Sequence, residues 1–444
     1  MASDVTLAVR LRTAFTTVFR ALSNAGYRKF LLGLSISWLG AWMQTVAQGL
    51  LVLKLGGSGV DLGLTVMLQV GPMAALAPLG GVWADRFDRR KLLFIANAVG
   101  GAQALALAML VATGHATLPV VYGMAFLLGA INAVLNPAQQ AFTAEIVEPD
   151  DLANAVNLNL MTTNVARVMG PAVAGLIVAT AGIATCFFLN AASFVVAIGV
   201  LLLIRADQRR VETLKSWGRG HLREGIAHVS RNRDLAAAWW MNFVYAMLAW
   251  QFEVSIPLIV TKTFGGSASS YGLMFSAVGM GAVIGGAWGA SRIRPTHRDH
   301  LLAAVVGGAG MLATAFAPNL PIAIATCAIA GGAIVCWWGI LSGIFQIQAD
   351  PTFRARVTGL WQAGLHGGRP FGALLVGWAA AHLGARWPFI LGALGCVISI
   401  AVWTRVSGVG LREAFTSRKP IAGFGAERTE LDAFAAESEM ISKP

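Results

Sequence analysis

Three ionisable side chains stand deep inside long apolar stretches of the sequence, where a charge needs a specific reason. They are Glu253, Arg167 and Arg369. An ionised group at the centre of a membrane-spanning helix costs about 3 kcal/mol on insertion scales, so such residues face a bundle interior and mark ion or substrate pathways. Glu253 alone, of the 21 acidic residues, lies well inside an apolar stretch. A carboxyl group there can take up and release a proton, so we predict that Glu253 carries a coupling proton.

Other roles for these residues stay open. Glu253 is either the proton carrier or a static ion-pair partner of Arg167 or Arg369. His366 is an alternative carrier, because imidazole titrates close to neutral pH in water. The two arginines either bind an anionic substrate or hydrogen-bond to carbonyl groups and brace the bundle. Arg369 lies between Gly368 and Pro370, and these neighbours are expected to loosen the helix and free carbonyl oxygens.

The composition indicates an integral membrane protein. Of the 444 residues, 56% are hydrophobic and only 12% are charged, whereas soluble domains carry about a quarter charged residues. A membrane-spanning helix needs about 20 apolar residues, and twelve runs of about that length occur. They are 30–53, 62–84, 92–113, 118–141, 156–180, 184–204, 235–261, 271–291, 300–317, 321–346, 357–382 and 386–406. The predicted fold is therefore an all-α membrane protein with twelve transmembrane helices.

The basic residues give the orientation of these spans. With both termini in the cytoplasm, 28 of the 33 Lys and Arg residues fall in inside segments and three, Lys54, Lys262 and Arg386, fall outside. This asymmetry follows the positive-inside rule. The net charge of +12 thus reports topology, and nucleic acid is not an expected partner.

An internal repeat divides the chain into two halves of six helices. At an offset of 202, Gly129 pairs with Gly331, Arg167 with Arg369, and Gly170 with Gly372, and nearer the start the offset is 209. Parallel six-helix repeats are a common design of secondary transporters. The predicted organisation is an N-terminal segment, a first bundle, a cytoplasmic linker, a second bundle and an unstructured cytoplasmic tail. Their limits are 1–29, 30–204, 205–234, 235–406 and 407–444.

Enzymatic and cofactor-dependent functions find no support in the motifs. The four cysteines show no CxxC or Cys/His spacing, which argues against a metal site. No lysine follows a glycine, so the phosphate-binding loop of ATP-driven pumps is absent. No cluster of His, Asp and Glu marks a membrane-embedded active site. We expect no enzyme activity, no cofactor and no metal.

The loop after the second span carries a recognisable motif. Its sequence, Gly81-Val-Trp-Ala-Asp85-Arg86-Phe-Asp88-Arg89-Arg90-Lys91, resembles the loop signature of the major facilitator superfamily, with Asp88 in place of the usual glycine. The stretches 37–44, 136–141 and 164–171 look like the enterobactin-exporter and macrolide-efflux branch of the proton-driven drug antiporters. The resemblance implies a fold of two pseudo-symmetric six-helix bundles. The alternative for the loop is a tight turn whose basic residues anchor to anionic lipid.

The resemblance also implies where the substrate passes, because the first, fourth, seventh and tenth spans line the cavity in facilitator folds. Polar residues follow helical faces in three of these spans, and the tenth carries tryptophans. The candidate cavity residues, with Arg167 and Arg369, are Gln44, Asn132, Asn136, Asn242, Trp337 and Trp338. An aromatic, mostly uncharged lining suits an amphipathic or aromatic solute rather than a phosphate, nucleotide or sugar. The alternative is that these side chains only hold helices together.

The same resemblance predicts salt links between the halves at the inner gate. The expected partners are Asp85 with Arg354 or Arg356, and Arg292 or Arg294 with the acids around 148–151. The expected function is export of a siderophore or drug-like molecule through a bacterial inner membrane by alternating access, coupled to proton influx. The expected partners are the small-molecule substrate, protons and membrane lipid. The alternatives are a lipid or solute importer of the same fold, or a membrane receptor or scaffold.

Overall fold

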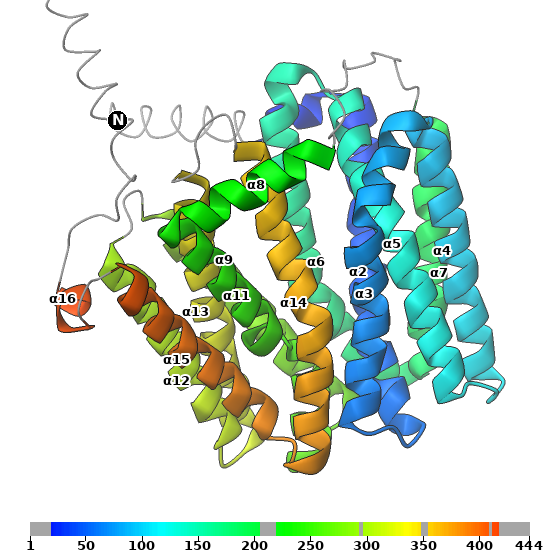
Figure 1. Ribbon diagram of the computed structural model, residues 1–444. Helices are drawn as coiled ribbons and strands as arrows, with labels where there is room; N and C mark the ends of the chain where they lie inside the picture. Colours follow the sequence, from blue (N-terminus) through cyan, green and yellow to red (C-terminus); the bar gives the residue numbers. More distant parts are fainter. Residues whose placement is uncertain (1–18, 205–218, 293–295, 348–353, 408–410, 417–444) are drawn as a thin grey trace, which may run out of the picture. The chain divides into compact units, whose positions relative to one another are not determined.

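The computed structural model describes residues 19–204, 219–292, 296–347, 354–407 and 411–416. All regular structure in this part of the chain is helical (Figure 1). The linker residues 205–218 and the tail beyond 416 lie outside the described residues, as does most of the N-terminal segment.

Six long helices form the first half, at the six predicted spans. A turn of 3-10 helix, η1 (Arg20–Ser23), precedes them, and a second one, η2 (Pro149–Asp151), lies between the fourth and the fifth. The long helices are α2 (Ala25–Lys54), α3 (Gly59–Arg86), α4 (Arg89–Ala112), α5 (Leu118–Ile146), α6 (Leu152–Ala181) and α7 (Ile183–Leu203). Asn24 begins α2, because its side chain accepts hydrogen bonds from the backbone amides of Gly26 and Tyr27.

The second half begins with the linker helix α8 (Arg219–Arg231). The predicted seventh span follows as α9 (Arg233–Val244), the π-helical segment η3 (Tyr245–Ala249), α10 (Phe252–Leu258) and a second π segment, η4 (Ile259–Thr263). The remaining spans are α11 (Ala268–Ala290), α12 (His297–Ala315), α13 (Leu320–Ile347), α14 (Arg354–His382) and α15 (Trp387–Ser407). A short helix, α16 (Leu411–Thr416), packs on α12, so the expectation of an entirely unstructured tail was wrong for these residues.

The helices have the lengths and compositions of membrane spans. Ten stretches of the described residues are long and apolar enough to cross a membrane. α12 and α14, at the predicted ninth and eleventh spans, have the length but more polar residues, including His300 in α12 and Arg369 in α14. The protein is therefore a multi-pass membrane protein, and its described helices fit the twelve predicted spans.

Two helix details differ from expectation. The seventh span is not one helix, because it is interrupted at Trp250 and Gln251 between two π segments. Pro257 lies within α10, where it has no amide hydrogen to donate to the carbonyl of Glu253, and the π segment η4 follows it. By contrast, α14 runs without a break through Pro370, so the prediction of a loosened helix around Arg369 was wrong. The other part of that prediction agrees with the structure, because the Arg369 carbonyl accepts a hydrogen bond from a neighbouring helix.

The chain divides into two compact units. The first comprises the described residues of Met1–Ser216 together with Ile256–Ser276, and the second those of Trp217–Ser255 together with Ala277–Pro444. The division therefore falls within the seventh span, beside Pro257. The predicted domain limits given above stay predictions.

Glycines bring corresponding helices into backbone contact in both units. A Cβ at Gly129 of α5 would overlap the carbonyl of Gln69 in α3, and a Cβ at Gly331 of α13 would meet the carbonyl of Val278 in α11. The two glycines are 202 residues apart and their partners 209 apart, the offsets at which the sequence repeats. The repeat thus recurs as the same packing contact in each unit.

Candidate functional site

An ion pair lies within the second unit at the level of the broken seventh span. Nη2 of Arg369 on α14 donates to Oε1 and Oε2 of Glu253 on α10, at 2.9 and 2.8 Å. Both side chains are largely buried, with 15% of Arg369 and 21% of Glu253 exposed. Of the two pairings predicted as alternatives to proton carriage, the structure contains the one with Arg369. Proton carriage by Glu253 stays a prediction.

His366 lies one helical turn before Arg369 on α14. Its ring is partly buried, and Nδ1 has no hydrogen-bond partner among the described residues. Because this places an imidazole and an ion pair on neighbouring turns, His366 remains the alternative proton carrier.

Gln251, which the sequence analysis did not single out, joins the broken helix to α14. Its buried Nε2 donates to the carbonyl of Ala246 at 2.7 Å and to the carbonyl of Arg369 at 3.2 Å. The prediction that polar residues of the seventh span follow one helical face did not include this residue. The sequence feature that could have identified Gln251 is a polar amide inside an apolar span, six residues before Pro257.

The predicted cavity residues of the second unit are engaged with neighbouring helices. Asn242 donates to the carbonyl of Trp361 at 2.8 Å and accepts from Nε1 of Trp338 at 3.1 Å. Trp337 is fully buried, and its Nε1 lies 3.1 Å from Nε2 of His300 on α12. These contacts favour a packing role for Asn242 and Trp337, while their contact with substrate stays untested.

In the first unit, Gln44 lies in a buried amide cluster between α2, α4 and α7. Its Oε1 accepts from Nδ2 of Asn190, and its Nε2 donates to Oε1 of Gln103 at 3.4 Å. Gln44 and Asn190 are each 1% exposed. Both ends of the Gln44 amide are thus satisfied within its own bundle, which favours helix packing over a pathway role.

The other predicted cavity residues of this unit are only partly buried. Asn136 on α5 contacts Sδ of Met73 on α3 at 3.7 Å, and Asn132 lies one turn earlier. The guanidinium of Arg167 lies 5.6 Å from the ring centre of Trp42, a cation–π geometry. Gly170 lets α6 approach this tryptophan, because a Cβ there would collide with Cβ of Trp42.

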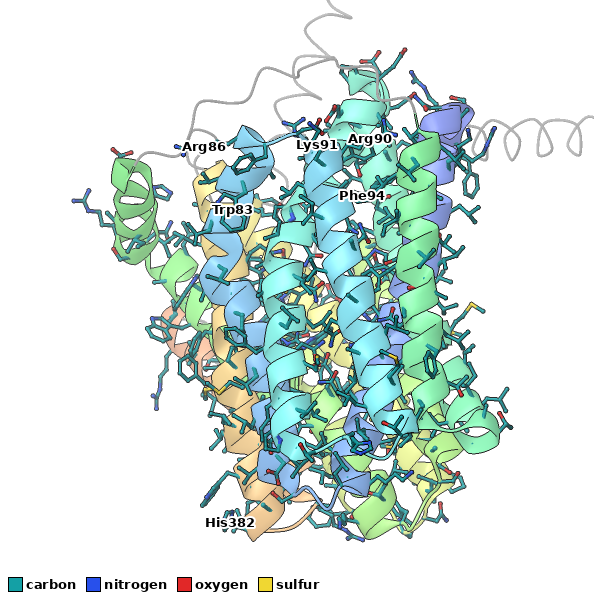
Figure 2. All side chains as sticks on the ribbon, turned by 90° about the vertical axis from the view of Figure 1, so that its right-hand side faces the viewer. Trp83, Arg86, Arg90, Lys91, Phe94 and His382 are labelled. Carbon is teal, nitrogen blue, oxygen red and sulfur yellow. The ribbon has the colours of Figure 1, made fainter. Side chains whose placement is uncertain are left out.

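The signature loop connects α3 and α4 at one end of the first unit. Asp88 caps α4 by accepting from the backbone amides of Arg90 and Lys91 at 2.9 and 3.1 Å. Figure 2 shows Trp83 and Arg86 at this end of α3, and Arg90, Lys91 and Phe94 at the start of α4. The departure from the family's glycine at 88 therefore has a structural use, since aspartate is a favoured helix N-cap.

Two loop arginines are tied to neighbouring helices. Arg89 donates to the carbonyl of Ala84 at 3.3 Å and pairs with Glu145 of α5 at 3.5 Å. Arg90 donates to the carbonyl of Leu202, at the end of α7, at 3.1 Å. A cation at a helix C-terminus also complements the helix dipole. The loop thus joins α3, α4, α5 and α7.

The predicted gate partners remain untested as salt links between the units. The side chains of Asp85, Arg354 and Arg356, and residue Arg294, lie outside the described part of the structure. Within their own units, Asp151 pairs with Arg20 at 2.8 Å, and Arg292 lies 4.0 Å from Asp299. Gly81 lies in α3 with open space around its α-carbon.

The described residues contain no candidate metal site. No group of three or more His, Cys, Asp or Glu residues there could hold a metal ion. The four cysteines are buried and unbonded to one another.

Two sets of membrane-spanning helices that repeat the same glycine contacts, together with an ion pair between two spans of the second set, are typical of a secondary transporter of the major facilitator fold. Residues 16–423 match the family model described as transmembrane secretion effector. The chain belongs to this family, which is a branch of the major facilitator superfamily. The resemblance seen in the signature loop is thereby confirmed, and so is the prediction that the protein is a transporter and not an enzyme.

Individual relatives agree with this assignment. The chain is 26% identical over 405 residues to the enterobactin exporter EntS of Shigella boydii serotype 18, an alignment covering 88% of this chain and 90% of the relative. The same exporter of Escherichia coli O1:K1 / APEC is 25% identical with the same coverage. The crystal structure of an inward-facing bacterial homologue of the human lysosomal transporter Spinster shares the fold, with a TM-score of 0.71 and 14% identity over 88% of this chain and 98% of that one.

Proposed function

We propose that this transporter exports a small amphipathic molecule of the siderophore or drug-like kind, in exchange for protons, by alternating access. The observation that carries the proposal is the Glu253–Arg369 ion pair between the seventh and eleventh spans. The similarity to enterobactin exporters over most of the chain supports a siderophore-type substrate. We further propose a bacterial inner-membrane location with both termini in the cytoplasm, on the basis of the asymmetry of the basic residues.

The ion pair supplies a simple coupling step. When the site faces the acidic outside, a proton on Glu253 removes the carboxylate charge that holds the Arg369 guanidinium. Arg369 then turns to other acceptors of the protein, and the substrate leaves. When the site faces inward, Glu253 releases the proton, the pair re-forms, and the next substrate binds against the paired guanidinium. Each cycle in this scheme admits a proton and allows substrate to leave in exchange.

The substrate contacts follow from the same groups. A catechol-type molecule offers aromatic rings and oxygen acceptors, which suit partly buried arginine and tryptophan side chains. Arg167 over Trp42 in the first unit and Arg369 in the second are the cationic groups that we propose for these contacts. Asn132, Asn136 and Trp338 are the further contacts that we propose.

The test is transport of enterobactin by everted membrane vesicles carrying Glu253→Gln. Wild-type vesicles should accumulate enterobactin when the lumen is acid, since everted vesicles take up what the cell exports. The Gln variant should lose this accumulation but retain exchange of enterobactin at equal pH. Glu413→Gln on α16, an exposed position, is the matched control and should behave as wild type.

Two outcomes would overturn the proposal. If the Glu253→Gln variant still concentrates enterobactin against its gradient in acid-lumen vesicles, Glu253 is not the proton carrier. If accumulation occurs only in right-side-out vesicles, the protein is an importer.

A further inference from the structure

The break in the seventh span is organised by one side chain, that of Gln251. In η3 the backbone amide of Trp250 bonds to the carbonyl of Tyr245, the five-residue spacing of a π turn. The next carbonyl, of Ala246, receives the Gln251 side-chain amide at 2.7 Å. The Gln251 carbonyl then accepts from the amides of Val254 and Ser255, which begins α10. Gln251 thus ends one helical segment with its side chain and begins the next with its backbone.

The second hydrogen of the same amide reaches across to α14. Nε2 of Gln251 lies 3.2 Å from the carbonyl oxygen of Arg369. Two glycines bring α14 this close, because a Cβ at Gly368 would meet the carbonyl of Phe243 and a Cβ at Gly372 would overlap that of Met247. The backbone of Arg369 is therefore held by Gln251, while its side chain holds Glu253.

The first half of the chain provides an internal comparison. Gly170, the counterpart of Gly372 at the offset of 202, approaches Trp42 of α2, as Gly372 approaches Met247 and Gln251 of the seventh span. α2 runs unbroken through Trp42 from Ala25 to Lys54. The same packing position thus tolerates a continuous helix, so the interruption accompanies the glutamine.

We propose that Gln251 is a positioning residue, which fixes Glu253 of α10 in reach of Arg369 by bonding the ends of the helix break to the α14 backbone. This role rests on the proposed coupling function of Glu253. Without the amide, the carbonyls of Ala246 and Arg369 lose a donor in a region with little water to replace it. The segment carrying Glu253 then loses its fixed register against α14.

The experiment measures two rates for enterobactin in proteoliposomes: efflux driven by an imposed pH gradient, and exchange at equal pH. The variants are Gln251→Leu, Gln251→Asn and, as a matched control, Gln362→Leu at an exposed position of α14. We expect Gln251→Leu to lower the ratio of driven efflux to exchange about fivefold or more, as the loss of a buried hydrogen bond allows. Gln251→Asn, which keeps the amide on a shorter chain, should fall between wild type and Leu, and the control should match wild type.

A purely structural role gives a different result. If Gln251→Leu lowers driven efflux and exchange by the same factor, or changes neither, the ratio of the two rates stays that of wild type and the positioning role is wrong. Glu253→Gln, measured in parallel, separates the two proposals. If Glu253→Gln keeps full pH-driven efflux, the coupling function of Glu253 is refuted. If Glu253→Gln loses driven efflux but Gln251→Leu keeps the wild-type ratio of driven efflux to exchange, only the role of Gln251 is refuted.

Discussion

The Glu253–Arg369 pair should contribute measurable coupling energy to the folded protein. Removing one member of a buried pair costs about 3 to 5 kcal/mol, because it leaves an uncompensated charge, whereas exposed pairs contribute at most about 1 kcal/mol. Both side chains are about four-fifths buried or more, and both carboxylate oxygens lie within 2.9 Å of the guanidinium. We therefore expect Arg369→Met to lower the free energy of unfolding by about 3 kcal/mol.

Neutralising both members should be milder than neutralising Arg369 alone. The double variant Glu253→Gln with Arg369→Met leaves no unpaired charge, so we expect it to lose about 1 kcal/mol. Because Glu253→Gln alone also leaves an unpaired charge, the four proteins of this double-mutant cycle should show a coupling energy of at least about 2 kcal/mol. The measurement is equilibrium unfolding in mixed detergent and SDS micelles at fixed pH. Arg405→Met at an exposed position of α15 is the control and should change stability by less than about 0.5 kcal/mol.

A coupling energy below about 0.5 kcal/mol would refute this account, because the pair would then behave as a solvated one. The same position also separates bracing from substrate binding. If Arg369→Lys leaves enterobactin transport intact while Arg369→Ala abolishes membrane expression, the arginine braces the bundle. Loss of transport in a well-expressed Lys variant would favour substrate binding.

Three further predictions concern packing and gating. Gly372→Ala should destabilise the protein by about 1 to 3 kcal/mol through overlap with Met247 of η3 and with the Gln251 side chain. Gly367→Ala, with open space where its Cβ would lie, should have little effect, and unfolding of both variants in SDS checks this. Gln44→Leu should cost about 1 to 3 kcal/mol in the same assay through its lost amide partners, and a raised KM for enterobactin at unchanged stability would contradict the packing role. For the predicted salt links at the inner gate, Asp85→Arg should abolish efflux, and adding Arg356→Asp or Arg354→Asp should partly restore it. Failure of both double variants to restore efflux would contradict these salt links.

The helices themselves were largely predictable from the sequence. Membrane spans require long apolar runs and intrahelical hydrogen bonds, so their number and approximate limits follow from composition. The repeat was also visible, because glycines at backbone contacts, such as Gly129 and Gly331, cannot be replaced without separating the helices. The glycine contacts within each unit and the family assignment agree with these predictions.

The side-chain roles were less predictable, for two physical reasons. Helical periodicity assumes 3.6 residues per turn, and the π segments and the break at Gln251 invalidate it beyond Ala249. Furthermore, a polar residue inside a span must avoid lipid, but it satisfies this requirement equally between helices of its own bundle. Gln44 and Trp337 do so through Asn190 and His300, and periodicity cannot distinguish these contacts from a cavity.

The repeat finally explains why a coupling charge should reside in only one half. The first-half helix α2 contains no acidic residue, and its buried amide Gln44 bonds within its own bundle. Both halves retain the arginine, as Arg167 and Arg369, and both retain the glycine one turn later. The scaffold is therefore duplicated, but the carboxylate and the helix break that positions it are not. Because only the second copy can gain and lose a proton at this position, the proposed coupling acts through one unit, while Arg167 over Trp42 keeps its charge at every stage of the cycle.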